Sequence, residues 1–319
     1  MTTSGSVDFN PTRDDVIKSA LRLCGVIDAE ETPTGAEIND TAQALNFMLK
    51  SWATKGIGLW AEQECTLFLE PSQILYRLGT ASGADHCTAS HVETTTATDE
   101  AISATVIGVT SSSGMTAGDF IGIVLDSGVT HWTTIVSVDS STQVTITSGL
   151  ASAAASGAVV YAYTSKIGRP SKIIEARHRG ASTSEAGDGT DLPLEPLARA
   201  DYMNLSVKST SGTPTQFFYS PQLSLGVLNI WPGASASGET IRMTIKRTIE
   251  DMDATSDTFD FPQEWLQAIR YNLAAEICME FKVPFQRMQM IIAKAMLLLE
   301  EAMGFDNEGA SFSFYPASH

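Results

Sequence analysis

The chain has 319 residues, enough for one large or two modest domains with a substantial buried core. Its hydrophobic fraction of 43% and charged fraction of 18% are typical of a globular protein. With 37 acidic against 20 basic residues, the formal net charge is -17. This charge argues against binding to nucleic-acid phosphates, because that affinity comes from cations that release counterions.

Two helices are predicted near the amino terminus. Thr12 is followed three residues later by Asp15, the arrangement of a capping box, and the apolar residues after them end at Gly25. Thr34 and Glu37 repeat the arrangement before a second apolar stripe. Each helix therefore has one hydrophobic face for a shared core.

The composition changes sharply between residues 80 and 165. This stretch is rich in Ser, Thr, Ala, Gly and Val and contains no Lys or Arg. Short strand-like runs separated by turn residues predict a small all-β barrel or sandwich; the runs are 104–109, 120–125, 131–138, 143–147 and 158–163. We expect an inserted domain that can be replaced by a short Gly-Ser bridge, because the ends of such a domain lie close together.

Further strands are predicted on both sides of this stretch, from alternating apolar and polar residues. They are 61–69, 172–179, 216–219, 225–231 and 240–249. A short helix is predicted within residues 193–209, and a loop of Gly, Ser, Thr and acidic residues within 180–191.

Two consecutive amphipathic helices are predicted from Phe261 to Met303. Pro262 suits a first helical turn, and Pro284 predicts a break at residues 282–284, because a residue before proline is pushed out of helical geometry. The apolar stripe of the first helix is Leu266, Ile269, Leu273, Ile277 and Phe281. That of the second is Met288, Ile292, Ala295, Leu299 and Met303, with Gly304 as the expected C-cap.

The first of these helices carries a family resemblance. Its sequence FPQEWLQAIRYNLAAEICMEF is similar to the C-terminal helix of the head-completion adaptors of short-tailed bacteriophages, also called packaged-DNA-stabilisation or portal-adaptor proteins. The segments TRDDVIKSALRLCGVI and EINDTAQALNFMLKSWATKGIGLW resemble the opening helices of that family. The resemblance covers about the first 79 residues and the last 150 or so, and it rests on packing residues without chemistry.

Together these patterns predict an α+β protein. Residues 1–79 and 166–304 would form the adaptor core, a helical bundle built from both chain ends with a β region. Residues 80–165 would form the inserted β domain, and residues 305–319 a C-terminal tail.

The resemblance implies a structural function at the head–tail junction of a virion. It implies a homo-oligomeric ring, a dodecamer matching the portal, that binds the portal protein and tail nozzle or tail-fibre proteins. Packaged DNA would pass through the lumen without specific binding, which an acidic wall favours because it repels a polyanion. We expect Phe312, Phe314 and Tyr315 of the tail to dock into the portal, and Trp265 and Tyr271 to pack at subunit contacts.

Catalytic and metal-binding patterns are weak in this sequence. His86, Cys87 and His91 lie together but have no partner at a zinc spacing, and the acidic segment 250–260 lacks the order of a calcium loop. The four cysteines, Cys24, Cys65, Cys87 and Cys278, are scattered and are expected to be core thiols in a reducing cytoplasm. No phosphate-binding loop or nucleophile elbow occurs, so we expect no metal, no cofactor and no enzyme.

Two alternatives from other classes stay open. The chain has enough carboxylates for a virion-associated hydrolase of cell-wall glycan, although no spacing singles out a pair. The inserted β domain could instead make the chain a carbohydrate-binding tail component. We expect no signal peptide and no membrane segment, because no apolar run approaches the length of a bilayer span.

Overall fold

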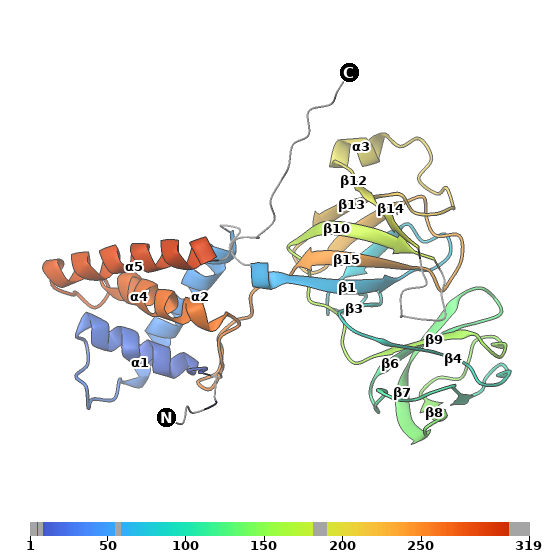
Figure 1. The fold of residues 1–319 in the computed structure, drawn as a ribbon, viewed down its shortest axis with the longest axis horizontal. Coiled ribbons are helices and arrows are strands. Elements are labelled where there is room, and N and C mark those ends of the chain that lie inside the picture. The colour runs from blue at the N-terminus through green and yellow to red at the C-terminus, as the bar shows by residue number, and fades with distance from the viewer. Residues whose placement is uncertain (1–4, 6–8, 55–58, 181–189, 306–319) are drawn as a thin grey trace. The chain divides into compact units, whose positions relative to one another are not determined.

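The computed structural model describes residues 5, 9–54, 59–180 and 190–305. The fold is mixed α+β with a curled β half-barrel, which confirms the predicted α+β class. The chain divides into two compact units, a helical unit of residues 1–61 and 249–319 and a strand unit of residues 62–248. Figure 1 shows the long helices in the first unit and the sheets in the second.

Helix α1 (Arg13–Cys24) begins and ends where the sequence predicts. The Asp15 N–H donates to Thr12 Oγ1 at 3.3 Å, and the Thr12 N–H donates to Asp15 Oδ2 at 3.2 Å. This reciprocal pair is a capping box, which satisfies backbone donors that a helix start leaves free. Gly25 ends the helix at a φ of 73°, a left-handed conformation that glycine adopts without a Cβ clash.

Helix α2 (Gly35–Thr54) starts with the second predicted box. Thr34 N–H donates to Glu37 Oε2 at 2.7 Å, and Glu37 N–H donates to Thr34 Oγ1 at 3.3 Å. Leu45, Met48 and Leu49 then face the core. A short 3₁₀ helix, η1 (Leu59–Ala61), ends the first segment of this unit.

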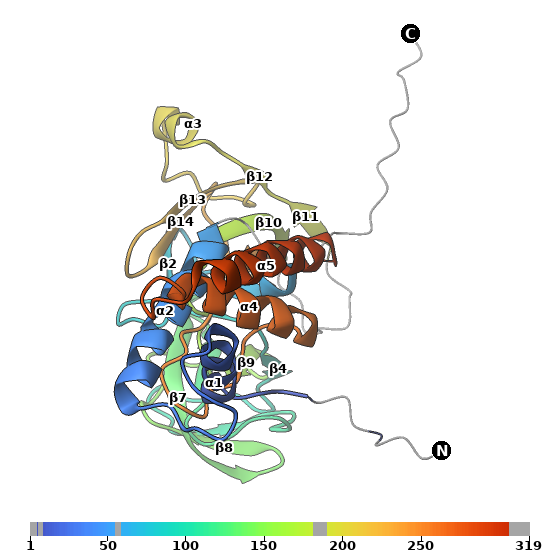
Figure 2. The same cartoon turned by 90° about the vertical axis from the view of Figure 1, so that its left-hand side faces the viewer.

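The C-terminal helices return to the same core. A 3₁₀ turn, η2 (Gln263–Trp265), leads into α4 (Leu266–Ile277), and α5 (Phe285–Phe305) follows. Lys282 adopts a φ of 52° between them, which confirms the predicted break. Pro262 precedes η2 as its N-cap and is not part of the helix. Figure 2 shows α5 alongside α4, where Asn272 Nδ2 donates to the Ala295 carbonyl at 3.1 Å.

One hydrophobic core joins α1, α2, α4 and α5. Aromatic rings lie at its centre, where Trp265 contacts Trp52 and Trp60 at centroid distances of 5.8 and 4.9 Å. Phe261 packs against Trp60 at 5.1 Å. The two ends of the chain are thus held together by rings from both segments.

One expectation for α5 was wrong and the other holds in part. Gly304 does not cap the helix, which continues to Phe305. Of the predicted stripe, Ala295 is buried and Met288 and Leu299 pack against the core, whereas Met303 is 43% exposed. Ile291 and Ala302, which lie outside the predicted stripe, are buried as well. Apolar residues occur on nearly every side of α5, so their spacing alone does not fix the edges of the buried face.

The strand unit contains two sheets over a common core, with inward residues such as Leu67, Leu228 and Ile241 fully buried. The five-stranded sheet has the order β11 (Asp191–Pro193), β10 (Lys172–Arg179), β15 (Thr240–Lys246), β1 (Glu62–Phe68) and β3 (Cys87–Thr88). The four-stranded sheet has the order β12 (Glu195–Pro196), β13 (Gln216–Pro221), β14 (Gly226–Trp231) and β2 (Leu75–Leu78). Helix α3 (Arg199–Asn204) lies between β12 and β13 in the chain.

A six-stranded sheet with its own core completes this unit. Its order is β4 (Val92–Thr95), β9 (Val159–Tyr163), β6 (Phe120–Val124), β7 (Thr130–Ser140), β8 (Gln143–Ile146) and β5 (Val106–Gly108). The edge strands β4 and β5 meet beyond their ends, where Thr110 N–H donates to the Thr95 carbonyl at 2.8 Å and Ala97 N–H to the Gly108 carbonyl at 2.9 Å. These bonds curl the sheet towards a barrel.

Candidate functional site

The aromatic residues predicted at subunit contacts lie in different surroundings. Trp265 is 1% exposed in the core of its own unit, so its ring offers no surface to a second subunit. Tyr271 is half-buried on α4, with the Arg270 guanidinium 5.6 Å from its ring centroid. The predicted portal-binding residues Phe312, Phe314 and Tyr315 lie outside the described residues.

The helical unit exposes large apolar side chains that the sequence analysis did not single out. Phe47 on α2 is 67% exposed and Met279, after α4, is 77% exposed. Along α5, more than two fifths of each side chain is exposed at Phe285, Met290, Met296 and Leu297. Single exposed apolar residues are ordinary, but six large ones on one helical unit are a notable share of exposed apolar surface.

An open groove lies between α2 and α4. It has a volume of about 410 Å³ and is lined by Asp40, Gln43, Ala44, Phe47, Glu276 and Glu280. The groove therefore combines an apolar ring with three carboxylates, and no cation lines it. We call it the α2/α4 groove.

A second hollow, of about 340 Å³, lies between α1 and the start of α4. Its apolar lining includes Phe9, Val16 and Leu266, and Arg270 stands at its edge. Arg270 Nε is buried and has no hydrogen-bond partner among the described residues. This hollow is more apolar than the α2/α4 groove.

The structure separates the residues considered as zinc ligands. His86 stacks on Trp132 with centroids 3.8 Å apart and shares a 2.5 Å hydrogen bond with Tyr163 Oη. Cys87 is buried, and His91 packs edge-on against Phe68 at 5.2 Å. Across the described ranges, no three His, Cys, Asp or Glu side chains are placed to hold one ion.

The acidic segment 250–260 uses its carboxylates to shape its own loop. Asp257 Oδ2 accepts from the N–H groups of Asp253 and Ala254 at 2.9 and 2.6 Å. Asp251 pairs with Lys50 at 2.6 Å. These bonds fold the loop back on itself and onto α2.

An aromatic junction joins the six-stranded sheet to β1. Phe68 contacts Tyr161 and Trp132 at centroid distances of 4.5 and 5.2 Å. Beside it, Glu70 accepts from Trp132 Nε1 at 3.3 Å and from the Thr130 N–H at 3.1 Å. Burial raises the pKa of Glu70, although both bonds lower it.

Burial at the same junction also fixes the charge state of His86. Loss of solvation lowers its pKa to about 3, and the nearby Lys166 acts in the same direction. His86 is therefore neutral at physiological pH. It serves as a packing ring and hydrogen-bond partner in this junction.

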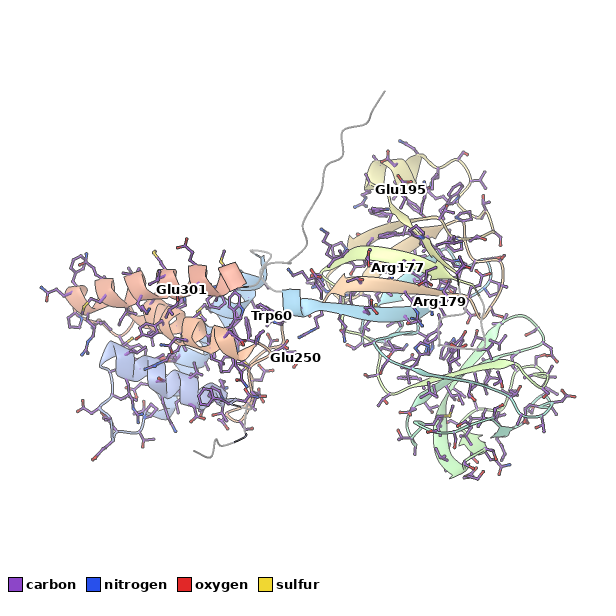
Figure 3. The ribbon with its side chains drawn as sticks, in the orientation of Figure 1. Trp60, Arg177, Arg179, Glu195, Glu250 and Glu301 are labelled. Carbon is purple, nitrogen blue, oxygen red and sulfur yellow. The ribbon has the colours of Figure 1, made fainter. Side chains whose placement is uncertain are left out.

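Three ion pairs stabilise the strand unit. Arg179 on β10 donates to both carboxylate oxygens of Asp191, at 2.8 and 3.0 Å, and Arg177 pairs with Glu175; Figure 3 labels both arginines. His178 Nε2 lies 2.9 Å from Glu239 Oε2 in the buried core. These pairs stabilise the sheet.

Comparison with known proteins gave no match, either to protein-family models or to curated protein sequences. Among the described helices, none has the length and apolar character needed to cross a membrane.

Proposed function

We propose that this chain is a structural head-to-tail adaptor of a short-tailed phage. It assembles as a homo-oligomeric ring beneath the portal, a dodecamer that matches the portal's symmetry, closes the filled capsid and receives the tail. The observation that carries the proposal is the exposed apolar surface of the helical unit, above all on α5. A ring subunit covers such side chains with its neighbours, whereas a free monomer leaves them in water.

The family resemblance and the helical unit support each other. The segments that resemble the adaptors' opening and C-terminal helices form α1, α2 and α4, which share one core. In the proposed architecture, this bundle from both chain ends, with its β region, is the adaptor core. The six-stranded sheet is then the inserted barrel-like domain.

The ends of the proposed insertion lie side by side, as an inserted domain requires. Thr88 Oγ1 is within hydrogen-bond distance of two carbonyls, at 3.0 Å from Ser90 O and 2.9 Å from Ser165 O. Ile167 N–H also donates to the Cys87 carbonyl at 2.9 Å. The chain thus leaves and re-enters the five-stranded sheet at one place.

The proposal assigns no catalytic role. Two carboxylates, the half-buried Glu70 and the buried Glu239, are held by neighbouring donors and anchor the strand unit. The net charge of -17 suits a ring whose wall repels DNA as it passes.

Truncation tests the proposed docking of the tail. A chain that ends after Phe305 keeps every described helix and strand, so its melting temperature should stay within about 2 °C of that of the full chain. It should no longer bind portal particles from the same phage in a pull-down. Full binding by the truncated chain would show that the tail is not needed for portal binding. A large fall in melting temperature would show that the tail packs in the protein's own core.

A further inference from the structure

The exposed side of α5 carries a narrow apolar stripe. Met290, Ala293 and Leu297 are exposed and spaced by three and four residues, which places them on one helix face. Lys294 lies beside them, four residues after Met290 and three before Leu297. Ile291 and Ala295 point into the unit, so the stripe faces away from its own core.

The α2/α4 groove has the complementary chemistry. Phe47 supplies an exposed apolar ring, and Asp40, Glu276 and Glu280 supply three carboxylates. None of these carboxylates has an ion pair within the described ranges, and neither does Lys294. The apolar α5 stripe with its cation is therefore complementary to the α2/α4 groove, which combines an apolar ring with three anions.

We propose that the α5 stripe of one copy docks into the α2/α4 groove of the next copy. Met290 and Leu297 would cover Phe47, and Lys294 would face the groove carboxylates. The two surfaces are different, so the contact is heterologous, and repeated copies form a ring when the rotation closes. This inference rests on the proposed ring function and names the surfaces that would build it.

A second copy is the occupant that the charges favour. Two chains of net charge -17 repel each other over most of their surfaces. Association therefore needs a place where opposite charges meet. Lys294 beside an apolar stripe, with an acidic apolar groove on the same unit, provides both halves of that contact.

Charge reversal tests the pairing. Sedimentation velocity of the full chain over a range of concentrations should show self-association. Lys294→Glu should raise the dissociation constant for self-association at least about tenfold, because like charges then face each other across the contact. Glu280→Lys should also weaken it, and the double variant should return to within about threefold of the original value. Lys172→Glu, at an exposed position of β10, changes the net charge by the same amount and should leave the dissociation constant unchanged.

Two results would overturn the pairing: no self-association of the original chain at any accessible concentration, or unchanged association of Lys294→Glu with the helical melt intact. A portal-binding assay separates this failure from failure of the proposed function. If Lys294→Glu still forms complete rings on portals, the contact is wrong and the adaptor function stands. If the original chain does not bind portals, the adaptor function itself fails.

Discussion

The fold brings cysteines that are far apart in the sequence into contact. Cys24 and Cys278 are 254 positions apart in sequence, yet their Sγ atoms lie 3.9 Å apart between α1 and the end of α4. Cys65 on β1 and Cys87 on β3 also contact each other. The sequence predicted that such residues are buried, and all four are. It could not predict the pairs, because their spacing follows no local rule.

Oxidation should join the first pair. Diamide accepts two electrons and two protons from two thiols, and the product should be a Cys24–Cys278 disulfide, detected as a linked peptide by mass spectrometry. The closed loop is long, so the melting temperature of the helical unit should rise by on the order of 10 °C. Burial raises the pKa of Cys24 to about 12, so the reaction should be faster at pH 9 than at pH 7.

Cys278→Ser is the control for this prediction. It should give no linked peptide and no rise in melting temperature under the same treatment. A diamide-treated original chain that still has both thiols free after denaturation would contradict the placement of these two helices.

Glu70 makes stability depend on pH. Its folded pKa is raised, so its contribution to stability is full below the unfolded pKa of about 4.3 and is lost as pH rises through the folded value. Glu70→Gln cannot ionise. Between pH 4 and pH 7, the unfolding free energy of the original chain should therefore fall relative to that of Glu70→Gln.

Glu70→Ala serves as the matched comparison in urea unfolding. It leaves the Thr130 N–H and Trp132 Nε1 without their acceptors, which should cost about 1–3 kcal/mol at both pH values. A difference between the original chain and Glu70→Gln that does not change with pH would mean that burial does not raise this pKa.

At the scale of elements, local signals were the most informative. The capping boxes at Thr12 and Thr34 and the αL glycine Gly25 fixed the ends of α1 and the start of α2, because these interactions lie within a few residues. The predicted stripe of α5 holds in part: Ala295, Met288 and Leu299 contact the core, but Met303 is exposed, because packing against the neighbouring helices sets the edges of the buried face. Strands β2, β3, β4, β11 and β12 were missed because they are short and form only by pairing with other strands.

The six-stranded sheet can be tested as a separable element. The sequence predicted an insertion of residues 80–165, but β3 (Cys87–Thr88) pairs with β1 and must be kept. The excision therefore has to begin after β3. Residues 91–164 should therefore be replaced by two glycines. Phe68→Ser is added because the excision removes the rings that cover Phe68 and would leave it exposed to water. The helical melt at 222 nm should remain cooperative, at a midpoint within about 3 °C of the original.

Phe68→Ser in the full chain is the control for this excision. It should lower the stability of the strand unit by about 3–5 kcal/mol, because it removes a buried ring from the aromatic junction. Loss of the cooperative helical melt in the excised protein would show that the six-stranded sheet is needed for the helical unit to fold.

At the scale of the whole molecule, the sequence predicted which segments belong to the helical unit but not which surfaces they leave free. Apolar periodicity indicated four amphipathic helices from the two chain ends, and these share one core. The exposed residues Phe47 and Met279 are apolar like the buried residues of the same helices, so residue type alone does not reveal that they are exposed. Only the packed helices distinguish a core residue from an exposed one.

Electron microscopy of the chain mixed with portal particles from the same phage tests the adaptor function most directly. We expect class averages to show an added ring on one end of each portal, with as many copies as the portal has subunits. The same images of Lys294→Glu should show incomplete rings or bare portals. Portals that stay bare with the original chain in excess, at a concentration where it is folded, would contradict the adaptor function.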